Sequence, residues 1–308
     1  MARMVIDDKL WKQLEALLPD RPKGGRPAND RLFIEAVCWV IRTGAPWRDM
    51  PSEYGPWKTV YNRYNRWCKT GEFNRILSIL KKDGDHEWHM IDGSNIRAHQ
   101  HAAGAIGGQE QQALGRSRGG FGTKIHAKVD ALGMPLRIKL TGGETHELQQ
   151  AAQLYASDYC EYLLADKAYD SGKFRGFLKD KGTIAVIPSK KNRVVQIPHD
   201  KHIYKERNFV ERFFNRIKQF RRIATRYDKL AVTLSGKEFL HQIYRRFLVM
   251  SALSARKLAD CVYTNTTQHR RAKLVVETRR GKTRRGSLVW SQLYTLMRSG
   301  MKIFCIFF

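Results

Sequence analysis

The sequence predicts a mixed α/β protein with one core sheet, preceded by a helical segment. Residues 7–81 contain four stretches with the apolar spacing of amphipathic helices. Residues 87–187 alternate short strand-like runs with helical ones, and a further helix is predicted at 204–218. With 308 residues, of which 42% are hydrophobic, the chain is long and apolar enough for a substantial core.

The N-terminal helices are predicted at 7–18, 31–43, 56–70 and 72–82, with Asp30 as the N-cap of the second. The third helix interleaves aromatic residues with the cations Lys58, Arg63 and Arg66. Short helices joined by tight turns, with a basic later helix, are typical of helix-turn-helix DNA-binding modules. Residues 1–85 are therefore predicted to form such a domain. The alternative is a small bundle whose basic face is only solvated.

The charge of the chain favours a polyanionic partner. Lys and Arg number 56 against 29 acids, which gives a net charge of +27, and the isoelectric point is about 10.1. An excess of this size points first to nucleic acid, and less to an anionic membrane surface. The five cysteines are scattered, and no run of 18 apolar residues is present. We expect a cytoplasmic, nucleoid-associated protein with reduced thiols and no membrane segment.

The α/β part is predicted to span residues 86–236. A strand at 87–92 ends on Asp92, a glycine-rich loop covers 93–122, and strands follow at 123–130 and 136–140. After a helix at 145–157, a buried strand at 160–165 ends at Asp166. A helix at 171–181 and a strand at 184–187 complete the alternation before the helix at 204–218. Asp130 is expected to close a strand turn, and Asp170 to cap the helix that follows it.

Three acids could converge on this sheet. On the predicted helix at 204–218, Tyr204, Arg207, Glu211 and Lys218 fall within about 60° of one another. Glu206 points instead into the apolar stripe that contains Val210, Phe213, Phe214 and Ile217. Asp92, Asp166 and Glu211 would make a hard oxygen site for Mg²⁺ or Mn²⁺. The alternative is that the two strand-end acids only cap turns.

Three stretches closely resemble bacterial DDE transposases of the insertion-sequence-five family: MIDGSNIRAH at 90–99, ALGRSRGGFGTKIHAKVDALGMPL at 113–136 and LADKAYD at 164–170. The chain also fits that family's signature Y-x2-R-x3-E-x6-K at Tyr204, Arg207, Glu211 and Lys218.

The resemblance implies an RNase H-like catalytic domain with mixed sheet and an Asp-Asp-Glu triad at Asp92, Asp166 and Glu211. It implies cleavage at insertion-sequence ends dependent on two Mg²⁺ or Mn²⁺ ions, then transfer of the 3′ hydroxyl into target DNA. The implied partners are terminal inverted repeats, target DNA and further copies of the chain. Two alternatives stay open: an RNase H-like metal nuclease that does not join, and a catalytically impaired DNA-binding regulator of transposition.

Further cations are expected to contact DNA phosphate. Arg207 and Lys218 would neutralise phosphate charge, and Tyr204 would stack or hydrogen-bond beside them. Arg116, Arg118 and Lys124 are expected to contact phosphate from the glycine-rich loop and the strand after it, with a solvated loop as the alternative. The H-x-H pair at His99 and His101 is expected to lie in a loop near DNA rather than bind metal.

Residues 237–308 depart from the family pattern and form an atypical basic tail, with 15 Lys and Arg against three acids. One interpretation is a replaced or frame-shifted C-terminus, which would leave the catalytic domain without its last helix. The other is a normally packed helix at 239–258 followed by a DNA-binding extension.

Overall fold

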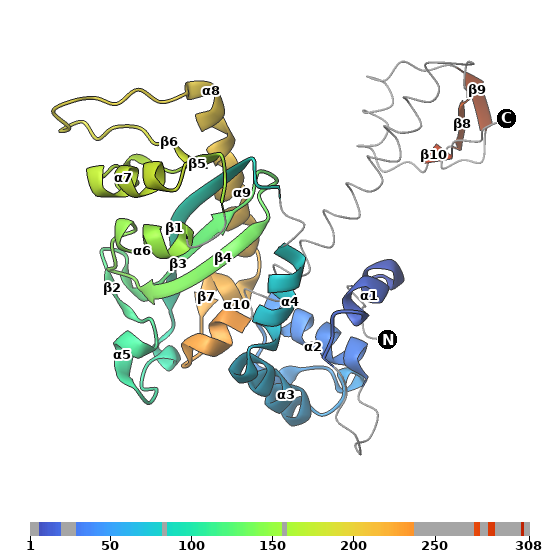
Figure 1. Ribbon diagram of the computed structural model, residues 1–308. Coiled ribbons are helices and arrows are strands. Elements are labelled where there is room, and N and C mark those ends of the chain that lie inside the picture. The colour runs from blue at the N-terminus through green and yellow to red at the C-terminus, as the bar shows by residue number, and fades with distance from the viewer. Residues whose placement is uncertain are drawn as a thin grey trace. The chain divides into compact units, whose positions relative to one another are not determined.

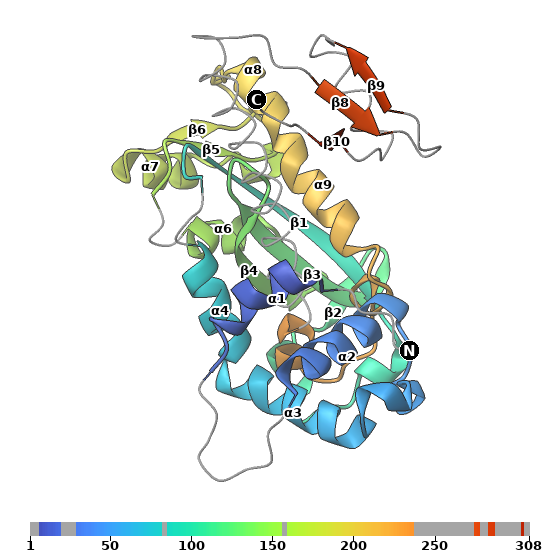
Figure 2. The same ribbon diagram turned by 90° about the vertical axis from the view of Figure 1, so that its right-hand side faces the viewer.

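The computed structural model describes residues 6–19, 29–81, 85–155 and 159–236, together with the backbone of three short strands further on. Residues 1–248 form one compact unit and residues 249–308 a second. In the second unit, a three-stranded antiparallel sheet is described (Figure 2). Its strands are β8 (Leu274–Glu277), β9 (Thr283–Gly286) and β10 (Ile303–Phe304). Both interpretations of the tail fall mostly on residues outside this description.

The N-terminal residues fold into the predicted helices. They are α1 (Asp8–Glu15), α2 (Asp30–Thr43), α3 (Trp57–Thr70) and α4 (Glu72–Leu80), with short 3₁₀ turns η1 (Trp47–Asp49) and η2 (Ser52–Tyr54) between α2 and α3. The predicted cap of α2 is wrong by one residue, because the Asn29 side chain accepts from the Leu32 amide. Gly44 and Gly71 end α2 and α3 in the left-handed conformation that glycine adopts without strain.

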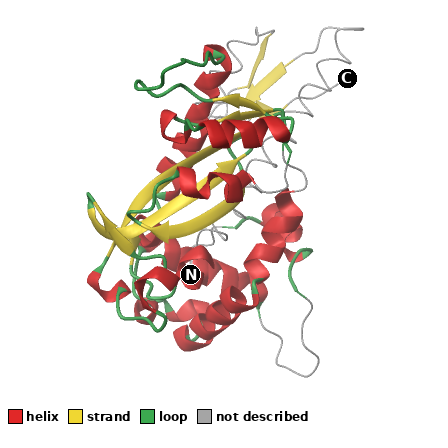
Figure 3. Ribbon diagram, turned by 60° about the vertical axis from the view of Figure 1, so that its left-hand side comes forward, coloured by secondary structure: helices red, strands yellow, loops and turns green. Residues whose placement is uncertain are grey.

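A seven-stranded mixed sheet forms the centre of the first unit, with helices on both faces (Figures 1 and 3). Its main path runs β2-β3-β1-β5-β6, with β4 also paired to β3 and β7 to β1. β1 is antiparallel to β3 and parallel to β5. The strands are β1 (Trp88–Ala98), β2 (Gly115–Ser117), β3 (Gly120–Val129), β4 (Pro135–Gly142), β5 (Tyr162–Leu164), β6 (Ile184–Val186) and β7 (Thr225–Arg226).

The long loop predicted at 93–122 is wrong in its first and last parts. Strand β1 continues through Asp92 to Ala98, and residues 93–97 pair with β3. Between β1 and β2 lie a 3₁₀ turn, η4 (Gln100–Ala102), and a short helix, α5 (Gly108–Gln111). Glycine and small polar residues weaken a strand locally, but here the register with β3 keeps the segment extended. Asp92 therefore lies within a strand, and not at its end.

Helices cover the two faces of the sheet. On one face lie α6 (Leu148–Tyr155) and α7 (Gly172–Asp180); the 3₁₀ turn η5 (Lys167–Tyr169) precedes α7. The other face carries α9 (Asn208–Ile217), which is preceded by α8 (Lys201–Tyr204) and η6 (Lys205–Arg207) and followed by α10 (Arg221–Ala224). The predicted apolar stripe of α9 is confirmed, since Val210, Phe213, Phe214 and Ile217 are all buried. This burial fixes which side of α9 packs toward the sheet.

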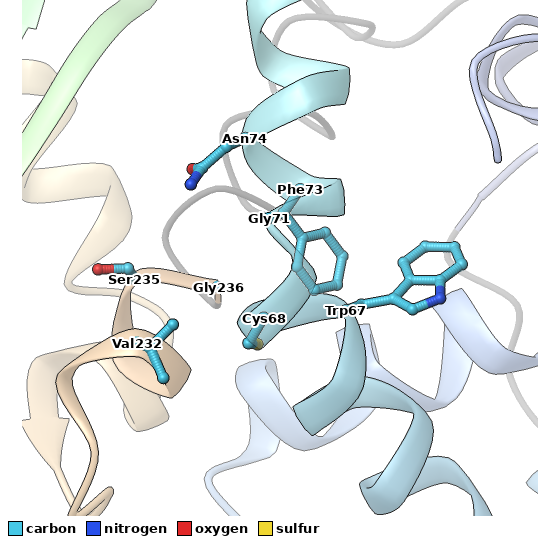
Figure 4. Close-up of a pocket in the computed structure, with 8 residues that line it drawn as sticks. All are labelled: Trp67, Cys68, Gly71, Phe73, Asn74, Val232, Ser235 and Gly236. Atoms are coloured by element: carbon cyan, nitrogen blue, oxygen red, sulfur yellow. The ribbon is translucent and has the colours of Figure 1, made fainter.

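The helical segment and the sheet share one apolar core. A single buried cluster joins residues of α1–α4 to residues of β1, β3 and α9. The Tyr64 hydroxyl donates to the Thr233 carbonyl, and the Arg222 guanidinium donates to the carbonyls of Gly44 and Ala45. A small pocket lies at this junction, lined by Trp67, Cys68, Gly71, Phe73, Asn74, Val232, Ser235 and Gly236 (Figure 4). The boundary at residue 85 stays a prediction.

Candidate active site

The parallel pairing of β1 and β5 brings two of the predicted acids side by side. Met90 pairs with Leu164 in that register. Asp92 and Asp166 each follow this pair by two residues, so they reach the same level of the sheet. The Asp166 carboxylate also accepts from the Ala168 amide at 2.8 Å, so it caps η5 as well. Sequence reasoning left a metal site and a cap as alternatives, and the geometry of Asp166 accommodates both.

Arg207 connects the strand acid to the helix acid. Its guanidinium lies 3.2 Å from Asp92 Oδ2 and also donates to Glu211. The Arg207 and Asp92 side chains are largely buried, at 17% and 18% exposure, whereas Glu211 is 51% exposed. About two turns beyond Glu211, Lys218 Nζ donates to Ser94 Oγ at 2.6 Å. Arg207, Glu211 and Lys218 thus share the helix face that was predicted for them.

Burial makes the charge of Asp92 unfavourable. Desolvation raises the pKa of the Asp92 carboxyl from 3.8 to about 6. The Gly93 amide and Arg207 act in the opposite direction, while the neighbouring charges of Glu147 and Asp166 raise the pKa further. Carboxylates held together against their own repulsion are frequent at functional sites, where a cation relieves that repulsion.

Glu147 is an acid of this site that sequence reasoning did not find. It directly precedes α6, and its Oε1 lies 3.6 Å from Lys124 Nζ. Burial raises the pKa of the Glu147 carboxyl, and the charge of Asp166 adds to the effect. The sequence around it, THELQQ, indicates only a helix start, where acids are common. No local pattern encodes that the β4–α6 connection passes over β1.

The residues near the sheet that are predicted to contact phosphate differ in their exposure and in their contacts within the protein. Arg116 and Arg118 lie exposed in and after β2. The Lys124 side chain is 13% exposed, and its Nζ donates to the Thr145 carbonyl at 2.9 Å. The Tyr204 ring, half-buried, lies under the Arg207 guanidinium at 5.8 Å. Lys124 is therefore engaged inside the protein, next to the acids.

On α3, the three predicted cations separate into two groups. Lys58 and Arg66 are exposed, and with Asn62 and Lys69 they follow one helix face. Arg63 is turned inward: it pairs with Asp30 and lies 4.2 Å from the Phe33 ring centroid and 4.9 Å from that of Trp67. The exposed face is thus free to meet a phosphate backbone, whereas Arg63 supports the packing of α2 on α3.

Two lesser expectations have clear outcomes. Asp130 closes the β3–β4 turn as predicted, because its carboxylate accepts from the amides of Leu132 and Met134. Asp170 does not cap α7. It is buried and binds Arg175 and Arg193 at 2.8 and 2.9 Å, which ties the loop after β6 to α7.

The H-x-H pair lies in a small ring stack. His99 stacks on Tyr227 at 4.9 Å between centroids, and His101 meets His99 edge-on at 4.6 Å. His101 and Tyr227 are exposed.

Two family models match this chain. Residues 85–234, which hold the sheet and the acids, match the family model described as "Transposase DDE domain". Residues 6–77 match the model described as "Putative transposase of IS4/5 family". Residues 85–234 therefore form a transposase domain of the DDE class, built on a mixed sheet.

Similarity to curated relatives specifies the family of the chain further. It is 40% identical over 125 residues to the "Putative transposase for insertion sequence element IS6501" of Brucella ovis, covering 39% of this chain and 92% of the relative. It is 42% identical over 102 residues to the "Uncharacterized protein y4sN" of Sinorhizobium fredii, covering 32% of this chain and 82% of that one. The chain belongs to the IS4/5 family of insertion-sequence transposases.

Among solved structures, the likeness is distant. A piggyBac transposase synaptic complex with hairpin DNA matches with a TM-score of 0.33 and 11% identity, over 61% of this chain and 48% of that one. A pre-cleavage Mos1 transpososome matches with a TM-score of 0.24 and 12% identity, over 78% and 86%. Among the described residues, no helix is both long and apolar enough to cross a bilayer.

The donor chemistry of the site suits the divalent metal ions that DDE transposases generally use. Asp92, Asp166, Glu147 and Glu211 offer hard carboxylate oxygens, and burial, with a smaller effect of the neighbouring acids, raises the pKa of Asp92. In the described part of the chain, however, no three acid, His or Cys side chains stand close enough to bind one ion. Arg207 and Lys124 lie against these carboxylates instead. In this structure Arg207 and Lys124 therefore neutralise carboxylates whose oxygens are of the type that divalent ions bind.

Proposed function

We propose that this transposase cleaves DNA at insertion-sequence ends and transfers the 3′ hydroxyl into target DNA, with Asp92, Asp166 and Glu211 as its catalytic acids. The observation that carries the proposal is the register that brings Asp92 level with Asp166 while Arg207 joins Asp92 to Glu211. In this proposal the three carboxylates hold Mg²⁺ or Mn²⁺. When bound, two such ions supply activation of the attacking oxygen and neutralisation of charge at the leaving oxygen.

The protein's own residues supply the remaining functions. Arg207 and Lys218 bind scissile-strand phosphate, because both present cationic donors on the α9 face beside Asp92. The ring of Tyr204 supports the Arg207 guanidinium from below. Ser94 holds Lys218 at the level of the strand, two residues past Asp92. These contacts orient the phosphate, and no covalent link between protein and DNA is needed.

DNA is the proposed partner of two further surfaces. The exposed face of α3, with Lys58 and Arg66, binds the phosphate backbone of the terminal repeats. The exposed hairpin residues Arg116 and Arg118 are proposed to contact further phosphates of the same DNA. Because two element ends must be joined in one event, the active form on DNA is a homo-oligomer.

An end-cleavage assay tests the proposal. Full-length protein is incubated with Mg²⁺ and DNA that carries the ends of its own element. Asp92→Ala, Asp166→Ala and Glu211→Ala are expected to abolish cleavage and joining while each still binds the DNA. Glu206→Ala, a change of the other acid on the same helical stretch, is the matched control and is expected to retain activity.

Other results of this assay would refute a catalytic residue or favour one of the alternative functions. Full activity in Glu211→Ala would refute the third acid. Cleavage without joining, on a pre-cleaved end and target DNA, would make the protein a metal nuclease. Sequence-specific binding without any cleavage by the unaltered protein would make it a regulator.

A further inference from the structure

Residues 188–200 form a basic loop between β6 and α8, which reaches out from the sheet beside α7 (Figure 1). We call this loop the arm. Its two sides are joined by hydrogen bonds, because Ser189 Oγ donates to the Ile197 carbonyl at 3.2 Å and accepts from the Ile197 amide at 2.9 Å. The side-chain amide of Gln196 donates to two main-chain carbonyls of the turn at 3.1 and 2.9 Å. The arm therefore has a defined shape of its own.

A buried acid fastens the arm to the rest of the fold. The Asp170 carboxylate, only 1% exposed, accepts from the Lys190 amide at 2.9 Å and pairs with the Arg193 guanidinium at 2.9 Å. Arg175 of α7 pairs with the same carboxylate at 2.8 Å. Ion pairs around a buried carboxylate are costly to break. The turn of the arm is therefore held in place relative to α7.

The tip of the arm presents two neighbouring apolar side chains to solvent. Val194 is 98% exposed and Val195 is 72% exposed. Single exposed apolar residues are common on protein surfaces. Here, however, two of them stand together on a turn whose shape is fixed by its own hydrogen bonds and by the ion pair of Arg193. Because β-branched side chains have few rotamers, the pair forms a small and rigid apolar surface.

Cations surround this apolar tip. Residues 188–202 contain four Lys and Arg against one acid. Arg193 is engaged in the ion pair at the base of the arm, whereas Lys191 and Lys201 are exposed and Lys190 is half-buried. An apolar tip between cations matches a DNA groove, in which sugars and base edges lie between two lines of phosphate.

A second copy of the chain suits the tip less well. Two valines present far less than the roughly 800 Å² that each partner contributes to a stable interface. The chain also carries a net charge of +27, so the cations of the arm would face a surface of like charge. Charge complementarity therefore favours DNA.

The arm leaves the fold beside the candidate active site. It follows β6, which pairs in parallel with β5, and β5 leads directly to Asp166. At the other end of the arm, the His199 ring lies 5.2 Å from the Tyr204 ring, which in turn lies under the Arg207 guanidinium. A duplex bound at the candidate active site would therefore pass next to the arm.

We propose that the arm binds duplex DNA beside the cleavage point, with Val194 and Val195 in the minor groove and Lys190 and Lys191 on the phosphates at its edges. The minor groove is about 6 Å wide, which is too narrow for a helix but admits a single turn of chain with small side chains. The inference rests on the proposed function, because the DNA is that of the element end.

Salt-dependent DNA binding tests both kinds of contact. The full-length protein is titrated onto a fluorescently labelled duplex that carries one element end and its flank, from about 50 to about 200 mM NaCl. The double variant Val194→Ser with Val195→Ser is expected to weaken binding by about tenfold at each salt concentration, because apolar burial releases no counterions. Lys190→Ala with Lys191→Ala is expected to reduce the slope of log affinity against log salt by about two, one for each lost phosphate contact.

Matched controls come from other exposed positions. Ile106→Ser is the control for the valines, because Ile106 is 96% exposed but precedes α5. Lys179→Ala with Lys181→Ala is the control for the lysines, since both are exposed and precede β6, whereas the arm follows it. Both controls are expected to bind DNA as the unaltered protein does. All variants are expected to melt close to the unaltered protein, because none of the altered side chains is buried.

A ligand that fills the minor groove tests the choice of groove. Netropsin is added to a duplex whose flank is rich in A·T pairs. It is expected to weaken binding of the unaltered protein and of Ile106→Ser, and to have little further effect on the double valine variant. An equal effect on all three proteins would overturn the minor-groove assignment.

The remaining outcomes separate the arm from the function on which the inference rests. Unchanged affinity in the double valine variant would overturn the groove contact, and an unchanged salt slope in the double lysine variant would overturn the phosphate contacts. A lower sedimentation mass of the DNA-free valine variant, with unchanged DNA affinity, would make the tip a contact between copies of the chain. If Arg66→Ala weakens DNA binding whereas no variant of the arm does, the arm fails and the proposed function stands.

Discussion

Replacing Asp92 with Asn is expected to make the folded protein more stable at neutral pH, although it removes a proposed catalytic acid. The pKa of Asp92 is about 6 in the folded protein and 3.8 for an ordinary exposed aspartate, chiefly because the carboxyl is desolvated. At 1.36 kcal/mol for each pH unit, this gap disfavours the folded state by about 3 kcal/mol once the group is ionised. Asparagine has nearly the same shape and carries no charge.

The pH dependence follows from the sign of this gap. Because the pKa of Asp92 is raised on folding, its contribution to stability is fully present below about pH 3.8 and is lost as pH rises through about 6. The advantage of Asp92→Asn should therefore be close to zero near pH 3.5, about half its full size at pH 5, and complete at pH 8. Arg207 loses one of its two carboxylate partners, which reduces the gain at pH 8 to about 1–3 kcal/mol.

Urea unfolding followed by circular dichroism, in EDTA at pH 5 and pH 8, measures this difference. Asp170→Asn is the control of opposite sign. Burial alone would raise the pKa of Asp170, but the Lys190 amide, Arg175 and Arg193 hold it below its usual range. Breaking these buried pairs is expected to cost about 3–5 kcal/mol at neutral pH, and the loss should shrink as pH falls below about 4. The reasoning is refuted if Asp92→Asn is less stable than the unaltered protein at pH 8, or if its advantage does not grow with pH.

Two further pairs of substitutions test the fold. Gly122→Ala would place a Cβ against the main-chain oxygen of the neighbouring strand β1, so we expect a loss of about 1–3 kcal/mol. Gly176→Ala, in α7 with open space around it, is expected to gain about 0.5–1 kcal/mol in the same unfolding assay; a loss there would contradict the open surroundings. Arg63→Ala should lower stability by about 2 kcal/mol, because it removes the ion pair with the buried Asp30 carboxylate. Arg66→Ala should leave the melting temperature unchanged but weaken binding of end DNA and reduce its salt dependence, as expected of a phosphate contact; equal DNA affinity would remove α3 from the interface.

Much of the layout could be predicted because its signals are local. The apolar stripe of α9 has helical spacing, and burial of Val210 and Phe214 confirms it. The left-handed glycines that end α2 and α3 are likewise visible in the sequence, as is the turn that Asp130 closes. The predicted length of β1 was too short, because Gly93 and the residues after it have weak strand propensity. Their pairing with β3, about 30 residues away, overrides that propensity.

The sequence by itself determined the class of protein, through motifs that resemble a known family. It also determined the order of the elements and the helix face that carries Arg207, Glu211 and Lys218, because these depend on spacing within single segments. Only the tertiary structure decided what surrounds Asp92. Arg207 arrives from α9, Asp166 from a parallel neighbour, and Glu147 from the opposite face of the sheet. Burial and mutual repulsion, which raise the pKa of Asp92, arise only when these distant segments pack together and exclude water.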